Sequence, residues 1–155
     1  MYIINRLTDE KVSCLIIEAT ARDLKNCQRN FHFDWLREIR LHEIYKLVTH
    51  ENQQIVQGLM SISIQSDFIF LPLIERAGYG AEKIKLYDGV AQILIAYACR
   101  LAIELGFDGC VAFDAKSELI KYYVKIAGAR QVGSSNRMII LPEQARKLVT
   151  LLYEK

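Results

Sequence analysis

The run EIYKLVTHENQQIVQGLMSISIQSDFIFLPLIER, residues 43–76, decides the fold of this 155-residue chain. It contains three apolar segments, EIYKLVTH, IVQGLMSISIQ and DFIFLPLIER, which are separated by the polar cluster ENQQ and the pair Ser66–Asp67. Short segments rich in β-branched and aromatic residues, divided by polar turns, are typical of consecutive antiparallel strands. The run therefore predicts a three-stranded meander.

Two details of this run refine the prediction. Apolar residues at 60, 62 and 64 alternate with polar residues at 61, 63 and 65, which indicates a strand with one buried and one solvent-facing side. Pro72 lies inside the third segment and has no N–H to donate to a ladder. We expect the third strand to be bulged at Pro72, or to part from its neighbour there.

On the N-terminal side, the apolar segment VSCLIIEA, residues 12–19, predicts a strand. Residues 20–30 are predicted to be a polar connection. The segment FDWLREI, residues 33–39, predicts a short helix with Asp34 near its start.

On the C-terminal side, the expected elements alternate between helices and strands. Residues 77–88 predict a loop, 89–106 a largely buried helix, 108–113 a parallel strand, 116–128 an amphipathic helix, 130–141 two short strands, and residues from Pro142 onward a last helix. Leu148, Leu151 and Leu152 share one side of the last helix, which either covers the sheet or faces a second subunit. A homodimer is therefore left open.

The composition favours a single globular domain over residues 1–155. Hydrophobic residues make up 52% of the chain and charged residues 25%, and 20 Lys and Arg stand against 18 Asp and Glu. So small an excess of positive charge gives no field that would hold DNA or an anionic membrane without specific contacts. Neither partner is predicted.

The four cysteines form no CxxC pair, and their spacing fits neither a zinc site nor a disulfide framework. They are interpreted as small apolar residues of a protein in a reducing cytoplasm. The N-terminus lacks the pattern of a signal peptide, and polar residues interrupt the longest apolar segment, 90–105, so no membrane span is expected. No metal site is predicted, because the histidines at 32, 42 and 50 lack ligand spacing and are interpreted as ordinary surface or strand residues.

Two motifs add to the order of elements. LYDGVA, residues 86–91, precedes the apolar residues of the buried helix, and the amphipathic helix carries Leu119, Tyr122, Tyr123, Ile126 and Gly128. Together with the order of elements over about residues 43–141, these motifs resemble the GNAT (GCN5-related) N-acetyltransferase superfamily. The resemblance implies an α/β (α+β) fold whose central mixed sheet is split between its fourth and fifth strands, with flanking helices. It also implies an acetyl-CoA-dependent N-acetyltransferase with acetyl-CoA as co-substrate, no metal, and an amine acceptor that the sequence does not identify.

In this resemblance, the 86–91 motif matches the loop that binds the pyrophosphate of coenzyme A. Small residues are required there because phosphate oxygens approach the unpaired amides at a helix N-terminus. The implied cofactor-binding residues are Leu86, Tyr87, Asp88, Gly89, Val90 and Ala91, with Lys85 and Lys83 as the nearby positive charges. The alternative is that Asp88 merely caps a buried helix by accepting from its first amides.

Tyr123 matches the tyrosine that protonates the departing coenzyme A thiolate, with Tyr122 as the reserve. A phenol with a pKa near ~10 keeps its proton at neutral pH and can donate it. The alternative is that Tyr123 is a core residue whose hydroxyl bonds to the backbone. Lys116 matches a position where the family often has an asparagine that faces the cofactor.

The topology implies two further site predictions near the split in the sheet. Glu75 is the carboxylate best placed to act as a base toward the acceptor amine, and its alternative is a solvated charge at a strand end. The backbone of Leu73 and Ile74, unpaired where the strands part, would bind the pantetheine amides and polarise the thioester carbonyl. A second hypothesis for the whole chain is a non-catalytic acyl-CoA-binding or protein-interaction module with the same fold.

Overall fold

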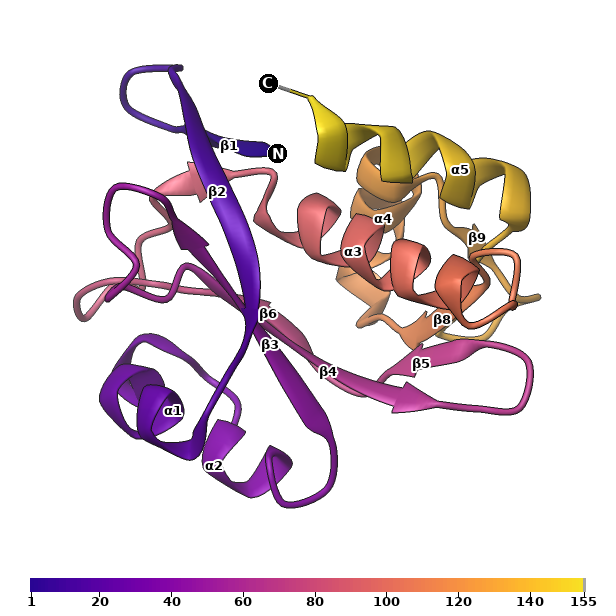
Figure 1. Ribbon diagram of the computed structural model, residues 1–155, viewed down its shortest axis with the longest axis horizontal. Coiled ribbons are helices and arrows are strands. Elements are labelled where there is room, and N and C mark those ends of the chain that lie inside the picture. Colours follow the sequence, from indigo (N-terminus) through magenta and orange to yellow (C-terminus); the bar gives the residue numbers. More distant parts are fainter. Residues whose placement is uncertain (155) are drawn as a thin grey trace.

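The structure is a computed structural model, and it describes residues 1–154. Figure 1 labels most of its elements. In chain order they are β1 (Tyr2–Asn5), β2 (Lys11–Glu18), α1 (Ala21–Cys27), η1 (Gln28–Asn30), α2 (Trp35–Glu38), β3 (Glu43–Thr49), β4 (Gly58–Ile64), β5 (Ile69–Leu71), β6 (Ile74–Arg76), β7 (Tyr87–Asp88), α3 (Val90–Glu104), β8 (Val111–Asp114), η2 (Ser117–Leu119), α4 (Ile120–Ala127), β9 (Arg130–Gln131), β10 (Arg137–Ile140), α5 (Pro142–Thr150) and η3 (Leu151–Tyr153), where η marks a 3₁₀ helix.

The strands form one mixed sheet in the order β7-β1-β2-β3-β4-β5-β8-β10-β9, and β6 also pairs with β4. The pairing of β5 with β8 is parallel, and the other strand pairs are antiparallel. This arrangement confirms the predicted mixed α/β fold, the meander and the parallel strand after the buried helix.

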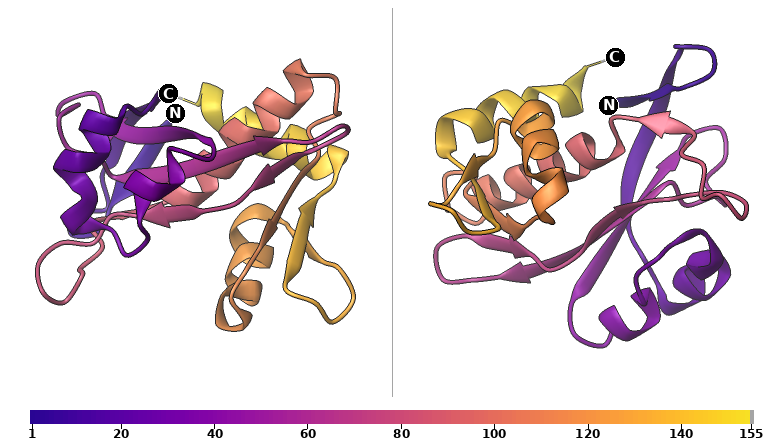
Figure 2. Two further views of the ribbon diagram at one scale, coloured as in Figure 1. Left: turned by 90° about the horizontal axis from the view of Figure 1, so that it is seen from below. Right: turned by 180° about the vertical axis from the view of Figure 1, so that it is seen from behind.

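Helices cover both faces of the sheet (Figures 1 and 2). On one face, Leu24 of α1 and Trp35 of α2 are fully buried against residues of β3 and β4. On the other face, α3 packs on the sheet, and α4 and α5 share its hydrophobic core. Leu148 and Leu152 are buried in that core, so the last helix packs against α3 rather than presenting these leucines to a second subunit.

The covering of both faces corrects two predictions. Ser61 was expected on a solvent-facing side of its strand, but it is fully buried beneath α2, whereas Ile64 beyond the edge of the helices is 57% exposed. Residues 20–30 were predicted only as a polar connection, but they contain α1. Its start is a capping box in which Thr20 Oγ1 accepts from the Asp23 amide and the Asp23 carboxylate accepts from the Thr20 amide.

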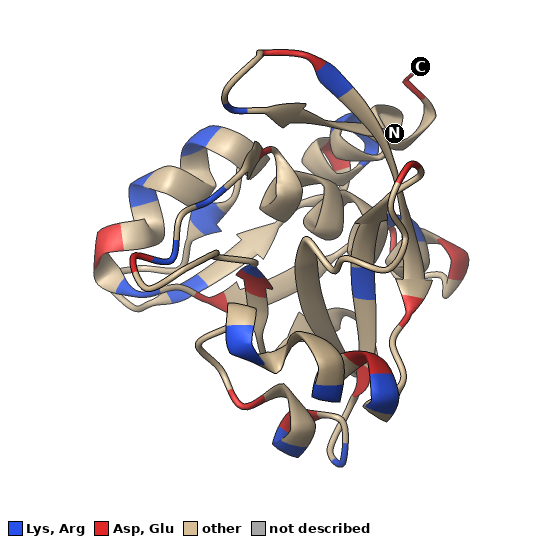
Figure 3. Ribbon diagram, turned by 90° about the vertical axis from the view of Figure 1, so that its left-hand side faces the viewer, with Lys and Arg blue, Asp and Glu red and all other residues tan. Residues whose placement is uncertain are grey.

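The cysteines and the charges agree with the globular interpretation. All four cysteines are free, and Cys14, Cys27 and Cys99 are buried. Both positive and negative residues occur over the side of the molecule in Figure 3. Within residues 1–154 no helix is both long and apolar enough to cross a membrane.

Helix α3 lies so close to the sheet that position 58 of β4 has no room for a side chain. A Cβ added there would collide with Cγ1 of Val90, a stiff β-branched side chain. We expect Gly58→Ala to lower the unfolding free energy by about 1 to 3 kcal/mol, as overpacking does. Chemical denaturation measures this loss. The double variant Gly58→Ala/Val90→Ala should be more stable than the sum of the two single changes predicts, and strict additivity would contradict this packing.

Candidate active site

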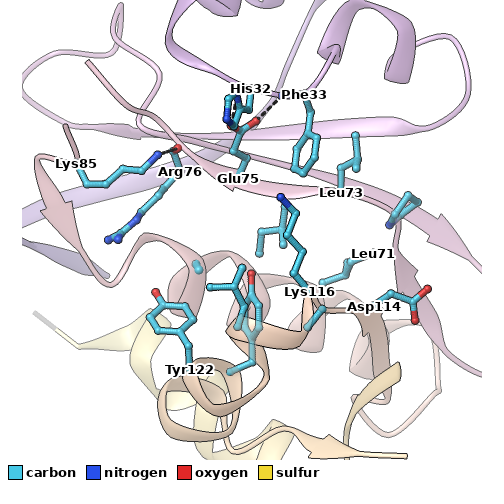
Figure 4. A pocket seen from close by; sticks show the side chains of 16 residues that line it. His32, Phe33, Leu71, Leu73, Glu75, Arg76, Lys85, Asp114, Lys116 and Tyr122 are labelled. Atoms are coloured by element: carbon cyan, nitrogen blue, oxygen red, sulfur yellow. Dashed lines mark hydrogen bonds between the residues drawn. The ribbon is translucent and has the colours of Figure 1, made fainter. Parts of the chain in front are cut away.

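A cavity of about 420 Å³ opens where the sheet splits (Figure 4). One wall is the strand run from β5 to β6, and the other is formed by the end of β8 and by α4, with loop residues on the rim. Its lining residues are His32, Phe33, Leu71, Pro72, Leu73, Ile74, Glu75, Arg76, Lys85, Ala91, Asp114, Ala115, Lys116, Leu119, Tyr122 and Tyr123.

A β-bulge at Pro72 creates the split. Ser63 of β4 lies opposite Phe70, whereas Met60 lies opposite Ile74. Between these pairs β4 has two residues, 61 and 62, and its partner has three, 71 to 73, so one residue is extra. The parallel pairing with β8 ends at Leu71, and β6 continues beside β4 alone. Of the two alternatives at Pro72, the bulge is confirmed on the β4 side, and the strand run parts from β8 on the other side.

The bulge decides which backbone groups face the cavity. The Ser61 amide donates to the Leu73 carbonyl over 2.9 Å, and the Ala77 amide donates to Gln57 over 2.9 Å. Antiparallel ladders alternate bonded and non-bonded pairs, so the N–H and C=O of Ile74 point away from β4, toward the side that β8 has left. The expectation of unpaired backbone groups therefore holds for Ile74.

For Leu73 the expectation of unpaired backbone groups is wrong. Its amide donates to Ser61 Oγ over 3.0 Å, and its carbonyl accepts from the Ser61 amide. Ser61 Oγ in turn donates to Oε2 of Glu38, at 2.6 Å. Glu38 lies on α2 and is 7% exposed, so a buried carboxylate anchors the hydroxyl that completes the bulge.

Glu75 lines the cavity, but its carboxylate is occupied. It accepts from the amide of His32 over 2.6 Å, from the amide of Phe33 over 3.1 Å, and from Nε1 of Trp35 over 2.9 Å. The carboxylate thus holds the loop before α2 against β6. The alternative of a solvated strand-end charge does not apply, and any base role would act through the single lone pair that these bonds leave on Oε2.

The predicted pyrophosphate loop meets the cavity only at its end. Ala91 lines the cavity, whereas Leu86, Tyr87, Asp88, Gly89 and Val90 do not. Tyr87 and Asp88 form β7, which pairs with β1, and the side chain of Val90 packs toward Gly58 of β4.

The start of α3 carries no side-chain cap. Gly89 is the N-cap residue with φ of 92°, a conformation that favours glycine, and no side chain accepts from the first amides. The alternative in which Asp88 caps the helix is therefore wrong. The Asp88 carboxylate instead lies 3.6 Å from both Arg6 and Arg76, which offset its charge. The first amides of a helix without such a cap can bind an anion.

Two positive side chains from the strand run and its following loop flank this helix start. Lys85 Nζ donates to the carbonyl of Arg76 over 3.1 Å, and both residues line the cavity. Burial, together with the charge of Arg76, lowers the pKa of Lys85. An anion bound beside these two residues would offset their mutual repulsion.

Tyr123 and Tyr122 line the wall opposite β6. Tyr123 is 7% exposed, and its ring packs edge-to-face on Phe113, with centroids 4.9 Å apart. Burial, with a smaller contribution from Tyr122, raises the pKa of Tyr123 to about 12. The phenol therefore keeps its proton at neutral pH. Within the described chain its hydroxyl has no hydrogen-bond partner, so the backbone contact of the core alternative is not made.

The structure adds residues that sequence reasoning did not select. His32, Phe33, Arg76 and Asp114 all line the cavity. His32 was interpreted as an ordinary surface or strand residue, and no local pattern indicates that its amide binds Glu75, 43 residues further along the chain. The predicted Lys116 also lines the cavity, and Figure 4 shows its side chain reaching inward.

The sequence matches no family model and no curated protein. Solved structures do match the fold. A crystal structure of AtaTR bound with AcCoA has 15% identity and a TM-score of 0.60, covering 92% of this chain and 99% of that one. The KacTA–DNA complex has 14% identity and a TM-score of 0.60, covering 89% and 99%.

A third match is a putative acetyltransferase of the GNAT family from Desulfovibrio desulfuricans. It has 9% identity and a TM-score of 0.57, and the match covers 82% of this chain and 96% of that one. These likenesses, with the split mixed sheet, show that the chain has the GNAT fold.

Glu75→Gln separates the loop-holding role from a base role. An amide must turn one N–H toward a backbone N–H of the loop, so we expect a loss of about 1 to 3 kcal/mol of unfolding free energy. Trp35 is the single tryptophan, so a change in its fluorescence emission reports the loosened loop directly. Glu51→Gln, at an exposed loop position, is the matched control. Unchanged stability and emission together with lost turnover would instead indicate a base.

Proposed function

We propose that this chain is an N-acetyltransferase that moves the acetyl group of acetyl-CoA to an amine by direct attack. The observation that carries the proposal is the pair of backbone groups of Ile74, which face a cavity where β6 and β8 part. Buried backbone groups require partners. The amides of a pantetheine arm, laid along β6 as an extra strand would be, supply them.

The size and charge of the cavity support the same ligand. A volume of 420 Å³ falls in the range of about 300 to 1,000 Å³ that is usual for small-molecule sites. The free amides at the start of α3, with Lys85 and Arg76 nearby, suit the pyrophosphate of coenzyme A. A solved structure of the same fold is bound with AcCoA, which supports the choice of this ligand.

The two walls of the cavity suit the two halves of the reaction. On the β6 wall, the Ile74 amide would polarise the thioester carbonyl as the amine attacks. On the α4 wall, Tyr123 would donate its proton to the thiolate that leaves, with Tyr122 as the second donor. Because Glu75 is engaged with the loop, we propose that water at the open rim beside His32 carries the proton away from the amine.

The non-catalytic alternative keeps one observation in its favour. Leu86 stands where the pyrophosphate loop of the GNAT family usually has a polar or basic residue, and it lies outside the cavity. A binding module would take up acetyl-CoA and leave it intact. Binding and turnover must therefore be measured separately.

Tyr123→Phe tests the catalytic proposal. Acetyl-CoA should raise the melting temperature of wild type, because it binds only the folded state, and the variant should keep both its stability and that shift. Turnover with a surrogate amine should fall by about 10²-fold or more, as for a positioned acid. Tyr97→Phe, on α3 and outside the cavity, is the control.

Three outcomes would count against parts of the proposal. Full activity of Tyr123→Phe would exclude that hydroxyl as the essential acid and would turn the test to Tyr122. A melting shift without turnover on any amine would favour the binding module. No shift at saturating acetyl-CoA would remove both coenzyme-binding functions.

A further inference from the structure

Lys116 is fixed at the wall of the cavity by contacts on either side of it. The Ala115 amide donates to the Asn136 carbonyl over 2.9 Å, and Asn136 Nδ2 donates to the Ala115 carbonyl over 2.6 Å. Asn136 also reaches the hydroxyl of Ser117. The backbone of Lys116 is therefore held at the end of β8, and its side chain extends into the cavity (Figure 4).

The amine of Lys116 does not help to hold the fold together. Among residues 1–154 it takes part in no ion pair. Two carboxylates line the same cavity, but both are engaged. Asp114 is bonded to Arg137 over 2.7 Å, and Glu75 accepts three N–H groups from the loop before α2.

The unpaired amine of Lys116 lies in the same cavity as the two groups that we propose to act on the thioester. Ile74, Tyr123 and Lys116 all line this cavity, and the side chain of Lys116 points into it. A primary amine held next to an acyl donor reacts as if it were highly concentrated, with effective molarities that reach about 10⁵ M or more in well-oriented cases. The flexible side chain of lysine can search this space.

We infer that Lys116 is itself acetylated by acetyl-CoA bound in the cavity. The inference rests on the proposed function. The ammonium first gives one proton to solvent, and the lone pair of Nζ forms a bond to the thioester carbonyl carbon. The C–S bond breaks, the coenzyme A thiolate takes a proton, and Nζ loses its second proton to solvent. The products are acetyl-lysine and free coenzyme A, and no oxidant or reductant is needed.

Acetylation changes the cavity in two ways. It removes a positive charge, and it places a neutral amide in space that an acceptor amine would enter. Self-acetylation is therefore expected to compete with acetyl transfer to an acceptor and to accumulate when no acceptor is present.

The test uses the wild-type chain with acetyl-CoA and no acceptor, and peptide mass spectrometry follows each lysine over time. Lys121 is the internal control, because it is exposed on α4 and does not line the cavity. Lys116 should be acetylated at least about tenfold faster than Lys121, as expected for a reaction within a bound complex. An excess of coenzyme A should slow the reaction at Lys116 and leave Lys121 unchanged, and heat-unfolded protein should lose the difference.

The melting shift with acetyl-CoA, measured on the same sample, separates the two hypotheses. A shift with equal rates at Lys116 and Lys121 would overturn the inference and leave the proposed function intact. Rapid acetylation of Lys116 that excess coenzyme A does not slow would also overturn it, because the reaction would then come from solution. No shift, with equal rates, would overturn both.

Discussion

The hydrogen bond from the Leu73 amide to the Ser61 hydroxyl is the contact on which the cavity depends. A proline at 72 removes one donor from the ladder, and the extra residue leaves the next amide without a strand partner. Ser61 Oγ takes that amide, and Glu38 fixes the hydroxyl in turn. Because the backbone groups of Leu73 are bonded to Ser61, the next residue, Ile74, can turn its own backbone groups toward the cavity.

The two walls of the cavity are held by separate parts of the chain. The β6 wall is tied to the helical segment before β3 twice, through Glu38 with Ser61 and through Glu75 with the loop at 32–35. The α4 wall is tied to α3, where Gln92 donates to the Ile126 carbonyl over 2.7 Å. Each wall is therefore held in place by contacts within the protein before a ligand binds, so binding does not have to order the wall.

Local patterns predicted most of the elements, because hydrophobic periodicity, prolines and glycines act over a few residues, but the short strands β1 and β7 were not predicted. The capping box of Thr20 and Asp23 is also local, but residues 20–30 were predicted only as a polar connection. Contacts between side chains that lie far apart in the sequence could not be predicted. Nothing near Ser61 indicates that Glu38 will cover it, and the occupation of Glu75 by the loop at 32–35 depends on how two segments meet in space.

The backbone of Ile74 offers the most direct test of this account. In an amide NMR titration of ¹⁵N-labelled protein with coenzyme A, the Ile74 resonance should shift strongly, because its N–H gains the pantetheine as a partner. The Leu73 amide, already bonded to Ser61, should change much less. Binding of coenzyme A that leaves Ile74 unmoved, and instead shifts amides far from the parting of β6 and β8, would contradict the account.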